Sequence, residues 1–242
     1  MMDKSELLSK SSRLKISIQS NLNNTYLWVK LAKEAVDQLP DTQFDFEVPS
    51  AKKIHRLKTV HRDDPKHLKE RIVTRDIPVS AFITIVSDIE DYLSKIMKWI
   101  LLTDNERIKC TIPGVNFAKE ISIVDFLTVD RVDLIEEIVD QRLSSLFYAK
   151  PQKQLEYLDK AVGIKIDDEI WNTWVEIKAR RDLWVHNEGV VNQIYIEKTG
   201  NKSGYIKDDI ATIDNGYFMG CISKLKTMVG CIDREIRKTY KE

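Results

Sequence analysis

The sequence is poor in the residues that build turns and covalent frameworks. Its 242 residues include only 8 glycines and 6 prolines, which favours a few long helices over many short strands. The cysteines Cys110, Cys221 and Cys231 are odd in number and form no Cys-x-x-Cys pair. The sequence therefore suggests neither a disulfide framework nor a zinc site, and we expect three reduced core residues.

Long apolar runs and a net charge are also missing. The longest apolar run, Ala81 to Val86, is interrupted by Thr84 and is far shorter than the roughly 18–20 residues that cross a bilayer. The N-terminus has no signal-peptide segment, so we expect a cytoplasmic protein without a membrane span. Lys plus Arg and Asp plus Glu balance at 38 each. Because broad nucleic-acid surfaces are usually basic, any contact with nucleic acid should be local, at a cleft or a subunit junction.

What the sequence does contain is a series of amphipathic helices, recognised by apolar residues at three- and four-residue spacing. We predict helices over the first 39 residues, from Pro78 to about Leu101, from Asp130 to Tyr148, from Pro151 to Gly163, from Asp167 to about Asn187 and from Asp214 onward. The helix that starts at Asp167 is called the motif helix below. Residues 40–65 should be irregular, and Val190 to Glu197 has β-type composition.

These patterns predict an all-α bundle of about five or six helices, with at most one small β-hairpin after the motif helix. We divide the chain into residues 1–77, an N-terminal helix and irregular connection packed on or extending the bundle, and residues 78–242, the helical domain. The stretch Lys52 to Arg71 is basic and contains three histidines spaced six apart. We interpret it as a solvated basic face in preference to an RNA-contacting arm.

The motif helix carries the residues with the most chemistry. Its apolar stripe runs through Ile170, Trp174, Ile177, Arg181 and Trp184. Arg181 therefore stands where an apolar residue is expected, which is costly unless the charge is paired or serves a site. Asp182 lies one turn before His186 on the same helix face, and Gly189 is expected in the left-handed position that ends the helix.

A purely structural interpretation of this segment stays open. An arginine four to six residues before a histidine is common by chance, Arg181 can pair with an internal carboxylate, and His186 can interact with the carbonyl end of the helix. The tryptophans at 171, 174 and 184 can stack on bases, but their helical spacing favours a place in the core.

The run from Arg181 to Asn192 resembles the signature of HEPN-superfamily proteins, in which a helical bundle carries an Arg-x(4–6)-His motif, usually with a polar residue after the arginine. The sequence Glu90-Asp-Tyr-Leu on an earlier helix is similar to the Phe/Ile-Glu-x-Tyr-Leu pattern of that family. The similarity is close over residues 178–200 and looser over 78–240, and it does not cover residues 1–77. Residues 103–165 depart from it as an insertion.

The resemblance implies a metal-independent endoribonuclease that uses no cofactor and acts as a homodimer on RNA. Attack of the ribose 2′-hydroxyl on the adjacent phosphate would leave a 2′,3′-cyclic phosphate. His186 would move a proton, Arg181 would stabilise charge on the phosphorane and Asp182 would fix the imidazole tautomer. The residues expected to contact substrate are Asn187, Arg180, Glu90 and Tyr92.

Many proteins of this family are toxins or effectors of bacterial anti-phage defence, so an antitoxin or a defence-system protein is an implied partner. Two alternatives stand beside the enzyme. The first is a non-catalytic HEPN module that binds RNA, a nucleotide or a partner protein. The second is a helical interaction protein whose Arg–His pair is structural.

Overall fold

The computed structural model of the chain describes residues 2–40, 45–48, 55–58, 65–117, 122–200 and 203–240. Its helices are α1 Lys4–Asp37, α2 Pro65–Arg71, α3 Ile77–Thr103, α4 Ile123–Thr128, α5 Arg131–Phe147, α6 Pro151–Tyr157, α7 Asp168–His186, α8 Gln193–Thr199 and α9 Asn215–Tyr240. A π-helical turn, Ile72–Asp76, joins α2 to α3, and another, Leu158–Val162, extends α6. A 3-10 turn, Asn105–Lys109, follows α3. The expected all-α bundle is confirmed.

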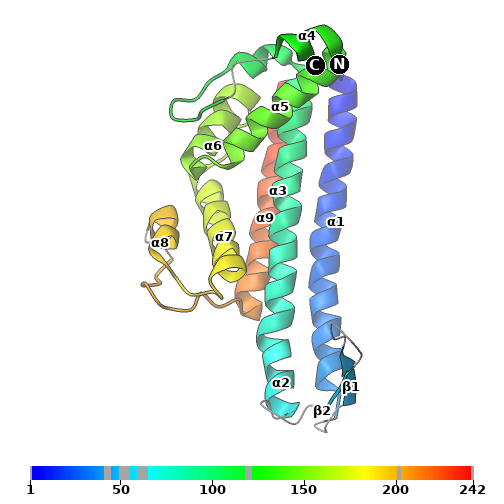
Figure 1. Ribbon diagram of the computed structural model, residues 1–242, viewed down its shortest axis with the longest axis vertical. Helices are drawn as coiled ribbons and strands as arrows, with labels where there is room; N and C mark the ends of the chain where they lie inside the picture. Colours follow the sequence, from blue (N-terminus) through cyan, green and yellow to red (C-terminus); the bar gives the residue numbers. More distant parts are fainter. Residues whose placement is uncertain are drawn as a thin grey trace.

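Three long helices, α1, α3 and α9, lie side by side and form the body of the fold (Figure 1). The motif helix α7 packs against α3 and α9 on the side away from α1, and α5 packs against α3. The short helix α8 packs on α7. The motif helix is thus supported from behind by two long helices and bordered by α8 and the α5–α6 junction.

The apolar stripes that predicted α3 and α9 face the core. The buried members on α3 are Phe82, Ile85, Ile89, Leu93, Ile96 and Ile100, and those on α9 are Phe218, Ile222, Leu225, Val229, Ile232 and Ile236. Each such side chain contributes roughly 1.5–3 kcal/mol when it leaves water. Two predicted starts are also confirmed: Asp130 accepts a hydrogen bond from Val132 N, and Asp167 accepts one from Glu169 N.

Two local predictions are wrong. Within residues 40–65, expected to be irregular, Asp45–Val48 pairs antiparallel with His55–Lys58. The β-type composition of Val190 to Glu197 is overridden by helix signals: Asn192 caps α8 by accepting a hydrogen bond from Tyr195 N at 2.9 Å, and Gly200 ends it at a φ of +60°. In the described part of this segment, strand-like pairing is limited to one bridge from Val190 to Ile210, so no hairpin follows the motif helix.

The N-terminal helix α1 is part of the same core as the bundle. Its buried side chains Leu7, Ile18, Leu22 and Val29 share one hydrophobic cluster with α3 and α9. A buried carboxylate on α9, Asp233, also holds α1, because it accepts a hydrogen bond from Lys15 Nζ at 2.8 Å. Helix α1 therefore stabilises the bundle from the side opposite the motif helix.

Much of the basic stretch Lys52 to Arg71 lies outside the described residues. Of its histidines, His61 and the side chain of His55 fall there, whereas His67 is exposed and lies 3.8 Å from Glu70. Over the described residues, the helices are all too short or too polar to span a lipid bilayer.

Candidate functional site

The motif helix stays regular up to its last residue, and this decides where its side chains point. Asp168–His186 is one α-helix, and its backbone closes normally, with Asn187 N donating to Leu183 O at 2.7 Å. Five residues at about 100° each put Arg181 and His186 about 140° apart around the axis. Arg181 accordingly faces α3, while His186 is exposed to solvent. Within one protomer, the two motif side chains diverge.

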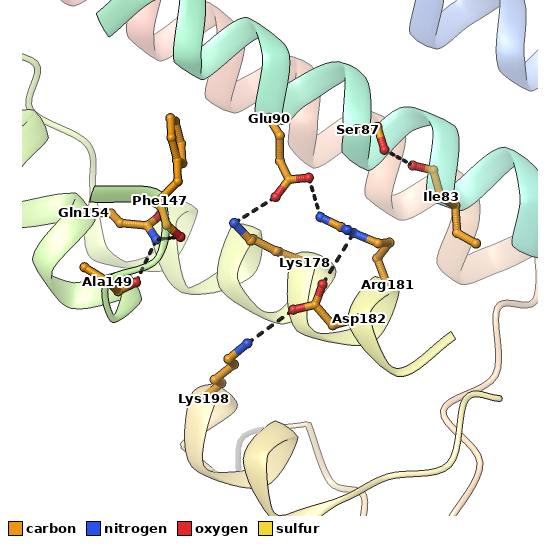
Figure 2. A network of polar contacts seen from close by, with 10 residues as sticks. All are labelled: Ile83, Ser87, Glu90, Phe147, Ala149, Gln154, Lys178, Arg181, Asp182 and Lys198. Carbon is orange, nitrogen blue, oxygen red and sulfur yellow. Dashed lines mark hydrogen bonds and ion pairs between the residues drawn. The ribbon is translucent and has the colours of Figure 1, made fainter. Parts of the chain in front are cut away.

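Arg181 is paired with a carboxylate from another helix. Figure 2 shows Glu90 on α3 reaching down between Lys178 and Arg181 of α7. Arg181 Nη2 donates to Glu90 Oε2, and Lys178 Nζ lies 2.8 Å from Glu90 Oε1. The Arg181 side chain is only 16% exposed. The charge that interrupts the apolar stripe is thus balanced by an internal carboxylate, one of the interpretations that the sequence left open.

Asp182 continues this network away from His186. Its Oδ2 lies 3.2 Å from Lys198 Nζ of α8, and its Oδ1 lies 3.6 Å from Arg181 Nε (Figure 2). Among the described residues, it makes no hydrogen bond to His186. The network of Glu90, Lys178, Arg181, Asp182 and Lys198 contains three cations and two carboxylates. It leaves one net positive charge, which favours an anionic ligand.

His186 stands free at the end of α7. The imidazole is exposed and makes no hydrogen bond or ion pair with any residue that the structure describes. The neighbouring Asn187 is not free: its Nδ2 donates to Val190 O at 2.6 Å and braces the turn that follows. His186 is therefore available to a ligand or a second chain, whereas the side-chain amide of Asn187 has a structural bond to break first.

The turn after His186 contains two consecutive left-handed residues. Glu188 has a φ of +52° and Gly189 a φ of +81°. The expected left-handed glycine is present, but the first left-handed position is occupied by Glu188, where glycine is usual. Backbone bonds hold this conformation, with Gly189 N donating to Leu183 O at 3.1 Å and Ala211 N donating to Gly189 O at 2.9 Å. These hydrogen bonds fix the turn at Glu188 and Gly189, called the pinned turn below, and this turn fixes the position of His186.

Arg180, a second candidate from the sequence, belongs to a buried cluster on another face of α7. Its Nε donates to Glu176 Oε1 at 2.8 Å, its Nη1 donates to Thr212 O at 2.9 Å, and its guanidinium lies 3.7 Å from the centre of the Tyr217 ring. Glu176 also accepts hydrogen bonds from Tyr195 and Tyr217. These contacts join α7, α8 and α9, so Arg180 supports the motif helix.

Sequence reasoning missed most of this cluster. The four-residue spacing from Glu176 to Arg180 is a readable ion-pair signal, but the two tyrosines come from other helices and leave no local trace. Burial and the Glu176 carboxylate raise the pKa of Tyr195 to about 12. The hydroxyl therefore stays protonated at neutral pH and serves as a hydrogen-bond donor.

Tyr92 is placed away from the motif helix. It is 1% exposed, and its hydroxyl donates to Val229 O of α9 at 3.5 Å. Burial raises its pKa well above the ordinary value. Because residues 90 and 92 of a helix point about 200° apart, Glu90 can face α7 only if Tyr92 faces the core. The structure therefore brings Glu90, Arg181 and Asp182 together and leaves Tyr92 out.

A cleft of about 550 Å³ adjoins the network between the α5–α6 junction, α7 and α8. Trp171 and Trp174 line its base, and they are only 3% and 2% exposed. Trp184 packs elsewhere, with its Nε1 donating to Ala211 O at 2.8 Å. These three tryptophans are core or partly buried residues, as their spacing favoured. The polar wall of the cleft comes from Lys178, Asp182 and Lys198.

No protein-family model, curated protein or solved structure matches this chain. Within the described ranges, no three His, Cys, Asp or Glu side chains are grouped so that they could hold a metal ion. A functional assignment therefore depends on the geometry of α7 and its surroundings.

Proposed function

We propose that the chain is a HEPN-type endoribonuclease that cleaves RNA without a metal ion. In the reaction, one imidazole takes the proton of a ribose 2′-hydroxyl, and the 2′-oxygen attacks the adjacent phosphorus. The bond from phosphorus to the 5′-oxygen breaks, and a second imidazole protonates that oxygen. The products are a 2′,3′-cyclic phosphate and a 5′-hydroxyl end. Since each motif contains one histidine, a homodimer would supply both proton carriers.

The observation that carries this proposal is the free imidazole of His186 at the end of α7. It is exposed, unpaired among the described residues and held in place by the pinned turn at Glu188 and Gly189. Arg181 points about 140° away, so an active site that uses both residue types fits two copies of α7 better than one. A composite site between two protomers therefore agrees with the geometry.

Arg181 keeps hydrogen-bonding capacity for a phosphate despite its ion pair. A guanidinium carries five N–H donors, and Glu90 occupies Nη2. Arg181 Nε is buried and makes no hydrogen bond within the described structure. Because this atom is buried, 3.6 Å from Asp182 Oδ1, a phosphate or phosphorane oxygen would gain a charge-assisted hydrogen bond from it only once a rearrangement opens this edge. Asp182 would act on Arg181 and Lys198, and a role in fixing the imidazole tautomer requires it to leave Lys198 first.

Those same contacts favour a second candidate function, a non-catalytic module that binds RNA, a nucleotide or a partner protein. Glu90 neutralises Arg181, and Asp182 pairs with Lys198 instead of His186. A site built for proton transfer usually has its histidine oriented by a hydrogen-bond partner. The two functions differ in one measurable property, which is whether purified protein shortens RNA.

Cleavage of total RNA by purified protein in the presence of EDTA tests the proposal. We expect His186→Ala and Arg181→Ala each to abolish cleavage while circular dichroism shows an unchanged helix content. Val185→Ala is the matched control for His186, because it is an exposed neighbour in the same helical turn. Arg107→Ala is the control for Arg181, since Arg107 is also partly buried and ion-paired but lies in the 3-10 turn after α3.

Each outcome has a defined meaning. Cleavage that survives His186→Ala, or a wild-type protein that cleaves no RNA in any preparation, contradicts the enzyme. In the latter case, RNA or nucleotide binding by the wild-type protein would support the module.

We also propose a bacterial toxin–antitoxin or anti-phage setting in the cytoplasm, with an antitoxin or defence protein as partner. Induced expression should then arrest growth for wild type and not for His186→Ala.

A further inference from the structure

The cleft beside the motif helix has the size and walls of a ligand site. Its volume of about 550 Å³ falls within the range of about 300–1,000 Å³ that is typical of small-molecule pockets. Trp171 and Trp174 form an apolar base, and charged side chains from α7 and α8 form one wall. The opposite wall is the α5–α6 junction, which includes Tyr148 and Lys150. Of these groups, only Asp182 also has a part in the chemistry proposed for His186.

The junction that forms one wall is held rigidly. Gln154 is 6% exposed, and its Nε2 donates to Phe147 O at 3.3 Å and to Ala149 O at 2.9 Å (Figure 2). Trp171 Nε1 donates to Pro151 O at 3.1 Å and ties the junction to α7. These hydrogen bonds are present without a ligand, so the walls of the cleft are preorganised. Binding of a ligand therefore does not have to order them.

Two side chains at the rim of the cleft, those of Tyr148 and Lys150, are exposed to solvent. Tyr148 is 92% exposed, which leaves both faces of an aromatic ring in water at the edge of an apolar pocket. Lys150 is exposed, and its ammonium group makes no hydrogen bond or ion pair with a described residue. The acidic rim residue Glu197 accepts a hydrogen bond from Gln193 at 3.1 Å. An exposed ring beside a free ammonium group is the combination that binds bases by stacking and phosphates by charge.

The cleft also runs in line with His186. Lys178 and Asp182 line it, and His186 is the next residue of the same four-residue row along α7. At 1.5 Å per residue, Asp182 is about 6 Å and Lys178 about 12 Å from His186 along the axis. Stacked nucleotides are spaced by about 3.4 Å, so the wall of the cleft that Lys178 and Asp182 form lies roughly two to four nucleotides from His186.

We propose that this cleft binds one nucleotide of single-stranded RNA, a few positions along the strand from the bond that is cleaved. The nucleobase stacks on the Tyr148 ring, above the apolar floor that Trp171 and Trp174 form. Lys150 contacts the adjoining phosphate. The choice of RNA as ligand rests on the proposed function, whereas the cleft itself does not. The site is a specificity and positioning site, and the reacting atoms stay at His186.

Binding of a 2′-O-methyl RNA oligonucleotide tests the cleft separately from cleavage, because this probe lacks the attacking hydroxyl. Fluorescence anisotropy with a labelled 12-mer should show Kd rising roughly 5- to 150-fold in Tyr148→Ala, as expected for loss of a stacked base. Lys150→Ala should bind more weakly and show a smaller dependence on salt concentration. The controls Trp28→Ala and Lys30→Ala remove an exposed aromatic residue and an exposed lysine from α1 and should bind like wild type.

The outcomes separate this proposal from the enzyme. The proposed nucleotide site is refuted if both Tyr148→Ala and Lys150→Ala bind the oligonucleotide with wild-type affinity. It is also refuted if the wild-type protein does not bind the oligonucleotide. A mononucleotide that binds as tightly as the 12-mer also overturns it, because a strand is then not the ligand. Weakened binding in these variants supports the cleft even if RNA is never cleaved. Conversely, cleavage that depends on His186 stands even if the cleft variants bind normally.

Discussion

The substitution Gly189→Ala probes the turn that positions His186. Gly189 has a φ of +81°, and a Cβ added there would lie 2.6 Å from Trp184 Cε2 and 2.7 Å from Trp184 Cζ2. The left-handed backbone costs an alanine about 1–2 kcal/mol. The indole ring is rigid and is held by its bond to Ala211 O, so making room for the methyl group adds about 1–3 kcal/mol. We expect a total loss of about 2–5 kcal/mol.

Two other glycines provide matched controls that separate these causes. Gly200 has a φ of +60°, but no described atom lies within 4 Å of an added Cβ, so Gly200→Ala has the backbone cost alone. Gly220 lies in α9 with an ordinary helical backbone and equally open surroundings among the described residues. Gly220→Ala should stabilise the protein by about 0.5–1 kcal/mol, because alanine is the better helix former.

Thermal unfolding followed by circular dichroism measures the three effects. For a chain of this size, 1 kcal/mol corresponds to about 2–4 °C, so Gly189→Ala should lower Tm by roughly 4–20 °C and Gly200→Ala by roughly 2–8 °C. Gly220→Ala should raise Tm by roughly 1–4 °C. If Gly189→Ala lowers Tm no more than Gly200→Ala, the close approach between Gly189 and Trp184 is refuted, together with the rigid turn on which the position of His186 depends.

Two further predictions concern stability and thiol reactivity. Burial alone would raise the pKa of Asp233, but hydrogen bonds from Lys15 and Arg237 outweigh it and hold the pKa below its ordinary 3.8. Asp233→Asn should therefore cost about 1–3 kcal/mol in urea unfolding at pH 7. That cost should shrink as pH falls below about 4, since protonation removes the wild-type advantage; a constant difference would contradict the ion pair. Burial raises the pKa of the Cys221 thiol to about 12, so iodoacetamide at pH 8 should label it roughly 1,000-fold more slowly than an ordinary thiol. Mass spectrometry that finds Cys221 labelled as fast as the partly exposed Cys110 would disprove this.

The candidate site was only partly predictable from the sequence. The sequence identified Arg181 as a charge on a buried stripe, but its partner Glu90 lies 91 residues earlier and could not be chosen among the many acidic residues. Asp182 stands one turn from His186 in any helix, yet its carboxylate is drawn to Lys198 of α8, a helix that the sequence indicated as β-structure. Tyr92 and Glu90 are neighbours in a motif, and only the packing of α3 shows that they face different surroundings.

By itself, the sequence determined where the long helices begin and end and which of their faces are buried. Those properties depend on local physics: the apolar period, the caps at Asp130 and Asp167, and the left-handed glycines. Only the tertiary structure decided which charges meet, that Arg181 and His186 diverge, and that a cleft opens beside α7. Such contacts join residues far apart in the chain, and their geometry is set by how the helices pack against one another and not by any segment alone.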